Sequence, residues 1–184
     1  GVVSKGSRAL YPAEAATPFG MEMVERDRDA SSLCGTLLLG GAYTLGWGPT
    51  LTLEYIYNSP GYSDEEAGDY RNLRRRASDS LLGQGPLAAY AEGCLSRTAD
   101  PNLMLLRQHY VMLQYVDTGI HDVLDLTFRW TQCLDDGAGQ FLSIVEYYLG
   151  DHVKLFSIGS LRAGPNDRAL GDVLKRQWMI GLEY

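Results

Sequence analysis

The stretch that decides the fold of this chain is Lys175-Arg176-Gln177-Trp178-Met179-Ile180-Gly181-Leu182-Glu183-Tyr184. Every second residue is apolar or aromatic: Trp178, Ile180, Leu182 and Tyr184. The positions between them hold Gln177, Met179, Gly181 and Glu183. Successive side chains of a β-strand point to opposite faces, so the stretch predicts a strand with one apolar and one polar face. Aromatic residues at both ends of the apolar face are typical of a strand that crosses a membrane within a closed barrel.

The same alternation recurs upstream and predicts a mainly β protein. We expect strands over 33–47, 50–58, 103–116, 122–133, 140–149, 153–161 and 174–184. Residues 1–32 predict only a weak strand over 2–11, followed by a loop rich in Pro, Gly and charge over 12–29. The predicted fold class is all-β: a transmembrane antiparallel up-and-down β-barrel with about seven or eight strands in this chain.

Residues 58–102 interrupt the pattern, and the rest of 33–184 forms the predicted barrel strands. The interruption contains a charged helical stretch over 64–82, and it is far longer than the connections of compact domains. We therefore expect it to be a long extracellular or pore-constricting loop containing a helix. If the last strand ends on the periplasmic side, the short turns at 48–49, 117–121 and 150–151 are periplasmic, and 58–102, 134–139 and 162–173 lie outside.

Composition limits the class of protein. The chain has 184 residues, of which 45% are hydrophobic, and it has no run of apolar residues long enough for a membrane helix. A barrel strand needs only about 9 to 11 alternating residues, so the absence of such a run is compatible with a barrel. A formal net charge of -7 argues against a nucleic-acid partner.

Three groups of residues carry a resemblance to a known class of proteins. They are Leu134-Asp135-Asp136-Gly137-Ala138-Gly139, Tyr147-Tyr148-Leu149-Gly150-Asp151 with Gly181-Leu182-Glu183-Tyr184, and Leu53-Glu54-Tyr55-Ile56-Tyr57-Asn58 with Gly61-Tyr62-Ser63. Over residues 33–184 the chain resembles the C-terminal part of porin-like outer-membrane β-barrels of Gram-negative bacteria. The resemblance implies a location in the outer membrane and transfers no catalytic residue. Bacterial single-chain barrels have even strand numbers, so either residues 2–11 supply an eighth strand or the chain belongs to a larger barrel.

The alternation assigns residues to the two sides of the predicted barrel wall. The residues expected to face the lumen are charged: Glu54, Asp125, Arg129, Glu146, Lys154 and Glu183. They either select solutes in an open pore or pair with one another in a filled interior. The residues expected to face lipid or to form interfacial girdles are aromatic: Tyr43, Trp47, Tyr55, Tyr57, Phe128, Trp130, Trp178 and Tyr184.

Other reactive residues give weaker signals. His109, His121 and His152 lack metal-site spacing, and the chain has no GxSxG, so we expect neither a metal, a cofactor nor a catalytic residue. Cys34, Cys94 and Cys133 map to the outer end, where Cys94 and Cys133 could form a disulfide or stay unpaired. Residues Arg74-Arg75-Arg76 could bind lipopolysaccharide phosphates, enter the lumen, or form a solvated face.

The sequence predicts a porin-like channel for passive diffusion of small polar solutes, which is not an enzyme. Its expected surroundings are outer-membrane lipid and lipopolysaccharide, with a homo-oligomer or a partner protein inside or beside the barrel. Two alternatives stay open: a structural barrel that sheathes or anchors a partner in an export or electron-transfer complex, and a soluble β-barrel that binds a ligand inside. Resistance to SDS before boiling would separate the soluble form from the membrane forms, and conductance would separate the channel from the sheath.

Overall fold

The structure is a computed structural model that describes residues 2–4, 8–27, 34–83, 85–98, 106–150, 152–164 and 176–184. The chain divides into two compact units. One unit comprises residues 1–37 and 58–108, and the other comprises residues 38–57 and 109–184. The first unit is thus built from two segments that are far apart in the sequence.

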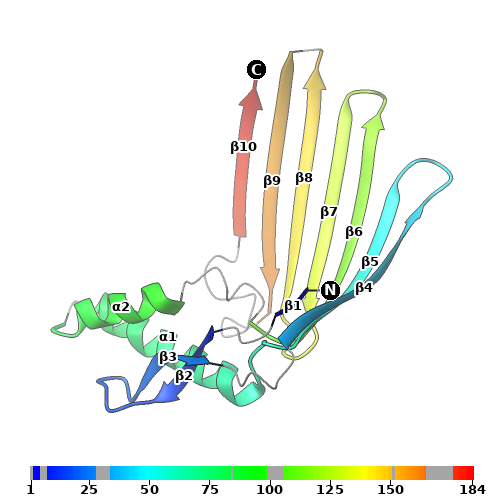
Figure 1. Ribbon diagram of the computed structural model, residues 1–184. Helices are drawn as coiled ribbons and strands as arrows, with labels where there is room; N and C mark the ends of the chain where they lie inside the picture. The colour runs from blue at the N-terminus through cyan, green and yellow to red at the C-terminus, as the bar shows by residue number, and fades with distance from the viewer. Residues whose placement is uncertain are drawn as a thin grey trace. The chain divides into compact units, whose positions relative to one another are not determined.

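The main sheet is antiparallel, as the alternation predicts. Its order is β1-β4-β5-β6-β7-β8-β9-β10, so the strands from β4 onward lie side by side in chain order, as Figure 1 shows. The strand bounds are β1 Val2–Ser4, β4 Cys34–Thr44, β5 Thr50–Asn58, β6 His109–Ile120, β7 Leu124–Cys133, β8 Gly139–Leu149, β9 Val153–Ala163 and β10 Arg176–Glu183. In the described residues the sheet is open, with β1 and β10 as its edges.

Tight turns join alternate pairs of these strands. Between β4 and β5 the Leu45 amide donates to the Pro49 carbonyl at 2.8 Å, and between β6 and β7 the Asp122 amide donates to the Gly119 carbonyl at 3.0 Å. The strand β6 extends to Ile120, so most of the turn predicted at 117–121 is strand with a bulge between Asp117 and Ile120. The opposite ends of the strands carry the 50-residue connection between β5 and β6 and the short connection 134–138 between β7 and β8.

The N-terminal third of the chain contains strands that the sequence pattern missed. Residues 12–29 were expected to be a loop, but β2 (Arg8–Glu14) and β3 (Met21–Asp27) pair over seven positions as an antiparallel hairpin. Pro12 interrupts the sequence signal, yet it is tolerated because a two-stranded hairpin leaves each strand with a free edge. The segment Cys34 to Thr36 pairs with β1, so part of residues 2–11 does join the main sheet.

Two helices occupy the long connection between β5 and β6. The helix α1 spans Asp64–Leu82, the same bounds that the sequence predicts, and begins with a capping box between Ser63 and Glu66. The helix α2 spans Ala88–Thr98 and was not predicted beyond its Ala-rich start. In the described residues, neither helix is long and apolar enough to cross a membrane.

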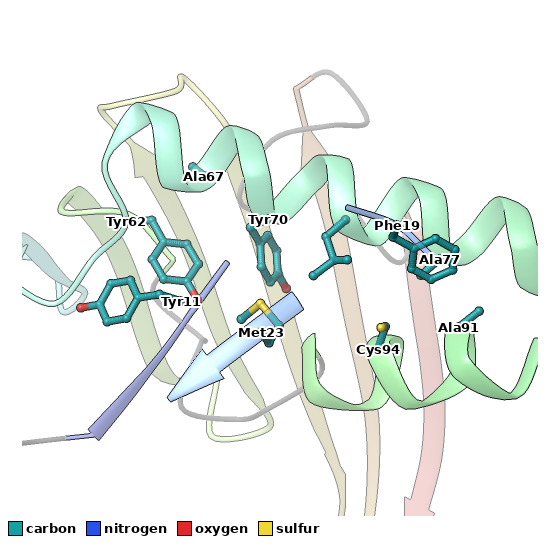
Figure 2. Packing of buried hydrophobic residues seen from close by; sticks show 10 residues of the cluster. Tyr11, Phe19, Met23, Tyr62, Ala67, Tyr70, Ala77, Ala91 and Cys94 are labelled. Atoms are coloured by element: carbon teal, nitrogen blue, oxygen red, sulfur yellow. The ribbon is translucent and has the colours of Figure 1, made fainter. Parts of the chain in front are cut away.

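The helices and the β2-β3 hairpin share a hydrophobic core, shown in Figure 2. Within α1 the buried residues Ala67, Tyr70, Leu73 and Ala77 follow the helical period and form one face. The core is fixed by hydrogen bonds between elements: Tyr62 donates to the Leu10 carbonyl at 2.5 Å, and Tyr70 donates to the Thr98 carbonyl at 2.8 Å. The β2-β3 hairpin and the two helices, which the sequence pattern places in separate segments, therefore fold together around one core.

The start of α1 is anchored by a buried arginine. Arg107 donates to the Ser63 carbonyl at 2.6 Å and pairs with the Asp64 carboxylate. Its backbone lies so close to Gly61 that a Cβ there would stand 2.2 Å from the Arg107 carbonyl oxygen. Glycine is required at this position because only a residue without a side chain allows the two backbones to approach.

The packing of α1 predicts a large cost for removing one buried leucine. Leu73 is fully buried, so Leu73→Ala should lower the free energy of unfolding of the helical unit by about 2–5 kcal/mol. Leu82 lies on the same helix but is 80% exposed, so Leu82→Ala should change that free energy by less than about 0.5 kcal/mol. Urea unfolding followed by circular dichroism of the helices measures both. Equal losses in the two variants would contradict the packing described.

Candidate functional site

The register of the main sheet separates its side chains into two chemically different faces. Residues directly opposite each other in an antiparallel pair point to the same face, so the pairing can be followed from strand to strand. Two such rows each cross the six strands from β5 to β10. The first consists of Leu53, Leu113, Trp130, Phe141, Leu161 and, at the start of β10, Arg176. The second consists of Leu51, Tyr115, Phe128, Ser143, Gly159 and Trp178. We call the face that carries these rows the apolar face.

The apolar face is exposed across the whole width of the sheet. Large hydrophobic residues are 57% exposed at Leu53, 48% at Leu113 and 66% at Ile180. Aromatic rings stack within the face: Phe128 lies 6.1 Å from Tyr115 and 6.0 Å from Phe141, measured between ring centroids. In the described residues, no second layer of the same unit covers these side chains.

The opposite face, which we call the polar face, carries the six charged residues singled out from the sequence. The register places five of them on the same face: Asp125, Arg129, Glu146, Lys154 and Glu183. Glu54 lies on that face too, because it pairs with Met112, and Met112 pairs with Thr131, two residues from Arg129. The strand β4 follows the same division, since the Thr44 hydroxyl lies 3.0 Å from the Thr50 hydroxyl and a Cβ on Gly40 would meet the side chain of Glu54. The structure therefore brings all six to one side of the sheet.

The charges of the polar face form a connected cluster on β7 to β10. The Lys154 ammonium lies 2.7 Å from the Glu183 carboxylate and 3.2 Å from the Glu146 carboxylate. Asp125 stands opposite Glu146 in the register, and it accepts hydrogen bonds from the Tyr148 hydroxyl at 3.0 Å and the Gly119 amide at 2.7 Å. One ammonium, one phenol and one amide thus hold three carboxylates at the end of the strands that carries the tight turns.

Two further pairs of polar side chains on this face are hydrogen bonded. Arg129 donates through Nε and Nη2 to the Gln114 side-chain oxygen at 2.8 and 2.6 Å, and Gln140 donates to the Ser160 hydroxyl at 3.0 Å. Gln114 and Tyr148 were not among the sequence candidates, although their parity along the strands would have found them. The face is not wholly polar, because Met112, Ile144 and Phe156 share it.

The predicted girdle residues divide by position. Tyr55, Tyr57, Phe128, Trp130 and Trp178 lie on the apolar face by register, and Tyr43 follows the parity opposite to Gly40. Trp47 lies in the turn after β4, and Tyr184 follows the last strand and is 95% exposed. Phe128 lies in the middle of β7 rather than at its end.

The histidines do not gather. His109 lies at the start of β6, where its Nδ1 is 2.6 Å from the Tyr55 hydroxyl and its backbone amide donates to the Asp135 carboxylate at 2.9 Å. His121 lies at the β6-β7 turn and His152 at the β8-β9 turn. In the part of the chain that the structure describes, no group of three or more His, Cys, Asp or Glu side chains could hold a metal ion.

Of the two alternatives for Cys94 and Cys133, a disulfide or unpaired thiols, the structure has unpaired thiols. Both thiols are free, because Cys94 is buried in the core of the helical unit and Cys133 is buried at the end of β7 in the sheet unit. The side chain of Cys34 lies outside the described residues.

The arginine run is partly used inside its own unit. Arg76 donates to the Phe19 carbonyl at 2.6 Å, and Arg74 lies 5.8 Å above the Tyr70 ring. Arg75 is exposed on α1.

The cluster around Lys154 predicts a measurable coupling between charges. In a double-mutant cycle of Lys154→Met with Glu146→Gln, we expect a coupling of about 0.2–1 kcal/mol that decreases with salt, since both side chains are partly solvated. Glu54 lies on the same face but four strands away, and its row of register partners reaches β9 at Arg162 rather than at Lys154. The two charges are therefore separated both across and along the strands, so the cycle of Lys154→Met with Glu54→Gln should give almost no coupling. Urea unfolding of the refolded protein measures both cycles. Equal couplings would contradict the pairing.

Comparison of the chain with models of protein families, with curated proteins and with solved structures finds no match.

Proposed function

We propose that residues 38–57 and 109–184 form part of the wall of an outer-membrane β-barrel of a Gram-negative bacterium, with the apolar face toward lipid and the polar face toward an aqueous lumen. The observation that carries the proposal is the exposed apolar face, continuous from β4 to β10. Water-soluble monomers rarely expose apolar patches larger than a few hundred Å², whereas lipid solvates such a face without cost.

The dimensions of the strands support this function. The seven strands β4 to β10 contain 11, 9, 12, 10, 11, 11 and 8 residues. A tilted strand of about 9 to 11 residues crosses the hydrocarbon core of a bilayer. The connections differ between the two ends of the sheet, since the turns after β4, β6 and β8 are short and the 50-residue stretch between β5 and β6 lies at the other end. Short periplasmic turns with longer external loops are the rule in these barrels.

The strand directions specify how such a barrel would close. Neighbouring strands from β4 to β10 are antiparallel, so β4 and β10 run in the same direction and cannot pair with each other in an all-antiparallel barrel. An odd number of further strands is needed between them. The strand β1 has the required direction, because Val2, Val3 and Ser4 pair antiparallel with Thr36, Gly35 and Cys34, but it covers only the start of β4.

The polar face suits a lumen that small polar solutes cross by passive diffusion. It carries both charge signs with the charges hydrogen bonded to neighbours, as at Lys154 and Arg129. Such groups hold a fixed geometry beside water and interact with passing ions through their remaining lone pairs and protons. Lipopolysaccharide and lipid around the barrel, and a second copy or a partner protein beside or inside it, belong to this proposal.

Accessibility of paired positions tests which face meets lipid. Spin labels at Leu126 and Ile180, on the apolar face, should be relaxed strongly by oxygen dissolved in the bilayer. Labels at the adjacent Thr127 and Met179, on the polar face, should respond instead to a water-soluble nickel complex. The pairs share strand and depth, so depth cannot explain a difference. Labels at Leu126 and Ile180 that are shielded from oxygen would end the proposal.

Conductance in planar bilayers tests the channel. The protein should give discrete conductance steps, and Glu54→Lys should shift the reversal potential in a salt gradient toward anion preference. Glu54→Asp keeps the charge and should leave the reversal potential unchanged. A barrel that only sheathes a partner would insert into the bilayer without steps, and that outcome would exclude passive diffusion as the activity.

A further inference from the structure

The helical unit contains a cavity that the channel proposal does not use. It has a volume of about 270 Å³ and lies between β3 and α2. Met23 and Cys94, which both belong to the hydrophobic core in Figure 2, contribute apolar surface to it, together with Ala89. An apolar cavity of about 150 Å³ already accommodates benzene, so this one has room for a single ring and a small polar head.

The polar groups of the cavity carry opposite charges. Glu22 comes from β3 and Arg97 from the last turn of α2. Tyr90 also lines the cavity, and its ring centroid lies 5.2 Å from that of Phe19. A hydrogen bond with Thr17 lowers the pKa of Tyr90, but burial and the neighbouring Cys94 and Glu22 raise it, and the net pKa lies above the usual value. The hydroxyl therefore keeps its proton at neutral pH and can donate it to a ligand.

Gly93 lines the cavity from the exposed surface of α2, as Ala89 and Arg97 do. A Cβ built on Gly93 would find no atom within 4 Å, so a side chain at this position meets no steric obstacle. A larger residue here would add its side chain beside the other lining residues.

We propose that this cavity binds a small zwitterionic molecule with one apolar ring, of the chemical class of an aromatic amino acid. The ring lies against Met23, Ala89 and Cys94, the carboxylate pairs with Arg97, and the ammonium pairs with Glu22. Binding of a ligand of this size has a Kd on the order of 1 mM. The cavity would make the helical unit a sensor or a capture site for a solute, a role separate from passage along the polar face.

Titration of the full chain with L-phenylalanine in detergent micelles tests the proposal. Amide resonances of residues 22–23 and 89–97 should shift and saturate. The variant Gly93→Leu adds a bulky side chain to the lining of the cavity and should abolish the saturable shifts while α2 stays folded, which circular dichroism checks. The matched control is Gly68→Leu on α1, where a Cβ also meets nothing within 4 Å, and it should bind as the parent does.

Two further ligands and one charge variant distinguish the contribution of the aromatic ring to binding from that of the charged groups. Benzyl alcohol carries the ring without the charges, and L-alanine carries the charges without the ring, so both should bind at least several-fold more weakly than L-phenylalanine. Arg97→Gln should weaken L-phenylalanine by about two- to five-fold, since the pair is partly solvated. Absence of saturable shifts with L-phenylalanine, shifts that persist in Gly93→Leu, or equal binding of the three ligands would overturn the inference.

Discussion

The structure depends on the backbone hydrogen bonding that holds β4 to β10 in register. Because each pair from β5 to β10 is in register without a break over most of its length, side chains two residues apart stay on one face through these six strands. A slip of one residue in any pair would move Trp130 or Trp178 to the charged face and Arg129 or Lys154 to the apolar face. The separation of apolar and charged residues onto opposite faces therefore disfavours any shift in strand register.

The charged residues of the polar face are held by ion pairs and hydrogen bonds to neighbouring strands. Lys154 lies between two carboxylates, Asp125 accepts from Tyr148 and Gly119, and Arg129 is held by Gln114. Such local pairing lowers the cost of placing a charge beside apolar neighbours such as Phe156 and Ile144. It also fixes the directions of the side chains, which a surface that guides solutes needs.

The helical unit follows a different principle from the sheet. Its core joins two segments separated by β4 and β5, and it is closed by side-chain hydrogen bonds from Tyr62, Tyr70 and Arg76 to backbone carbonyls. The residues of the long connection between β5 and β6 therefore have their own buried core, which an ordinary loop lacks.

The sequence by itself determined the strands from β4 to β10, the helix α1 with its bounds and the common face of Glu54, Asp125, Arg129, Glu146, Lys154 and Glu183. These features depend on residue periods of two and 3.6, which neighbouring residues express directly. Only the tertiary structure decided that β2 and β3 pair, that α2 packs on α1, that Cys94 and Cys133 stay free, and that Met112 and Phe156 share the charged face. These features depend on contacts between residues distant in sequence, which no local periodicity expresses. The β2-β3 hairpin was missed because Pro12 in β2 and the charged residues of β3 interrupt the alternation that indicates a strand.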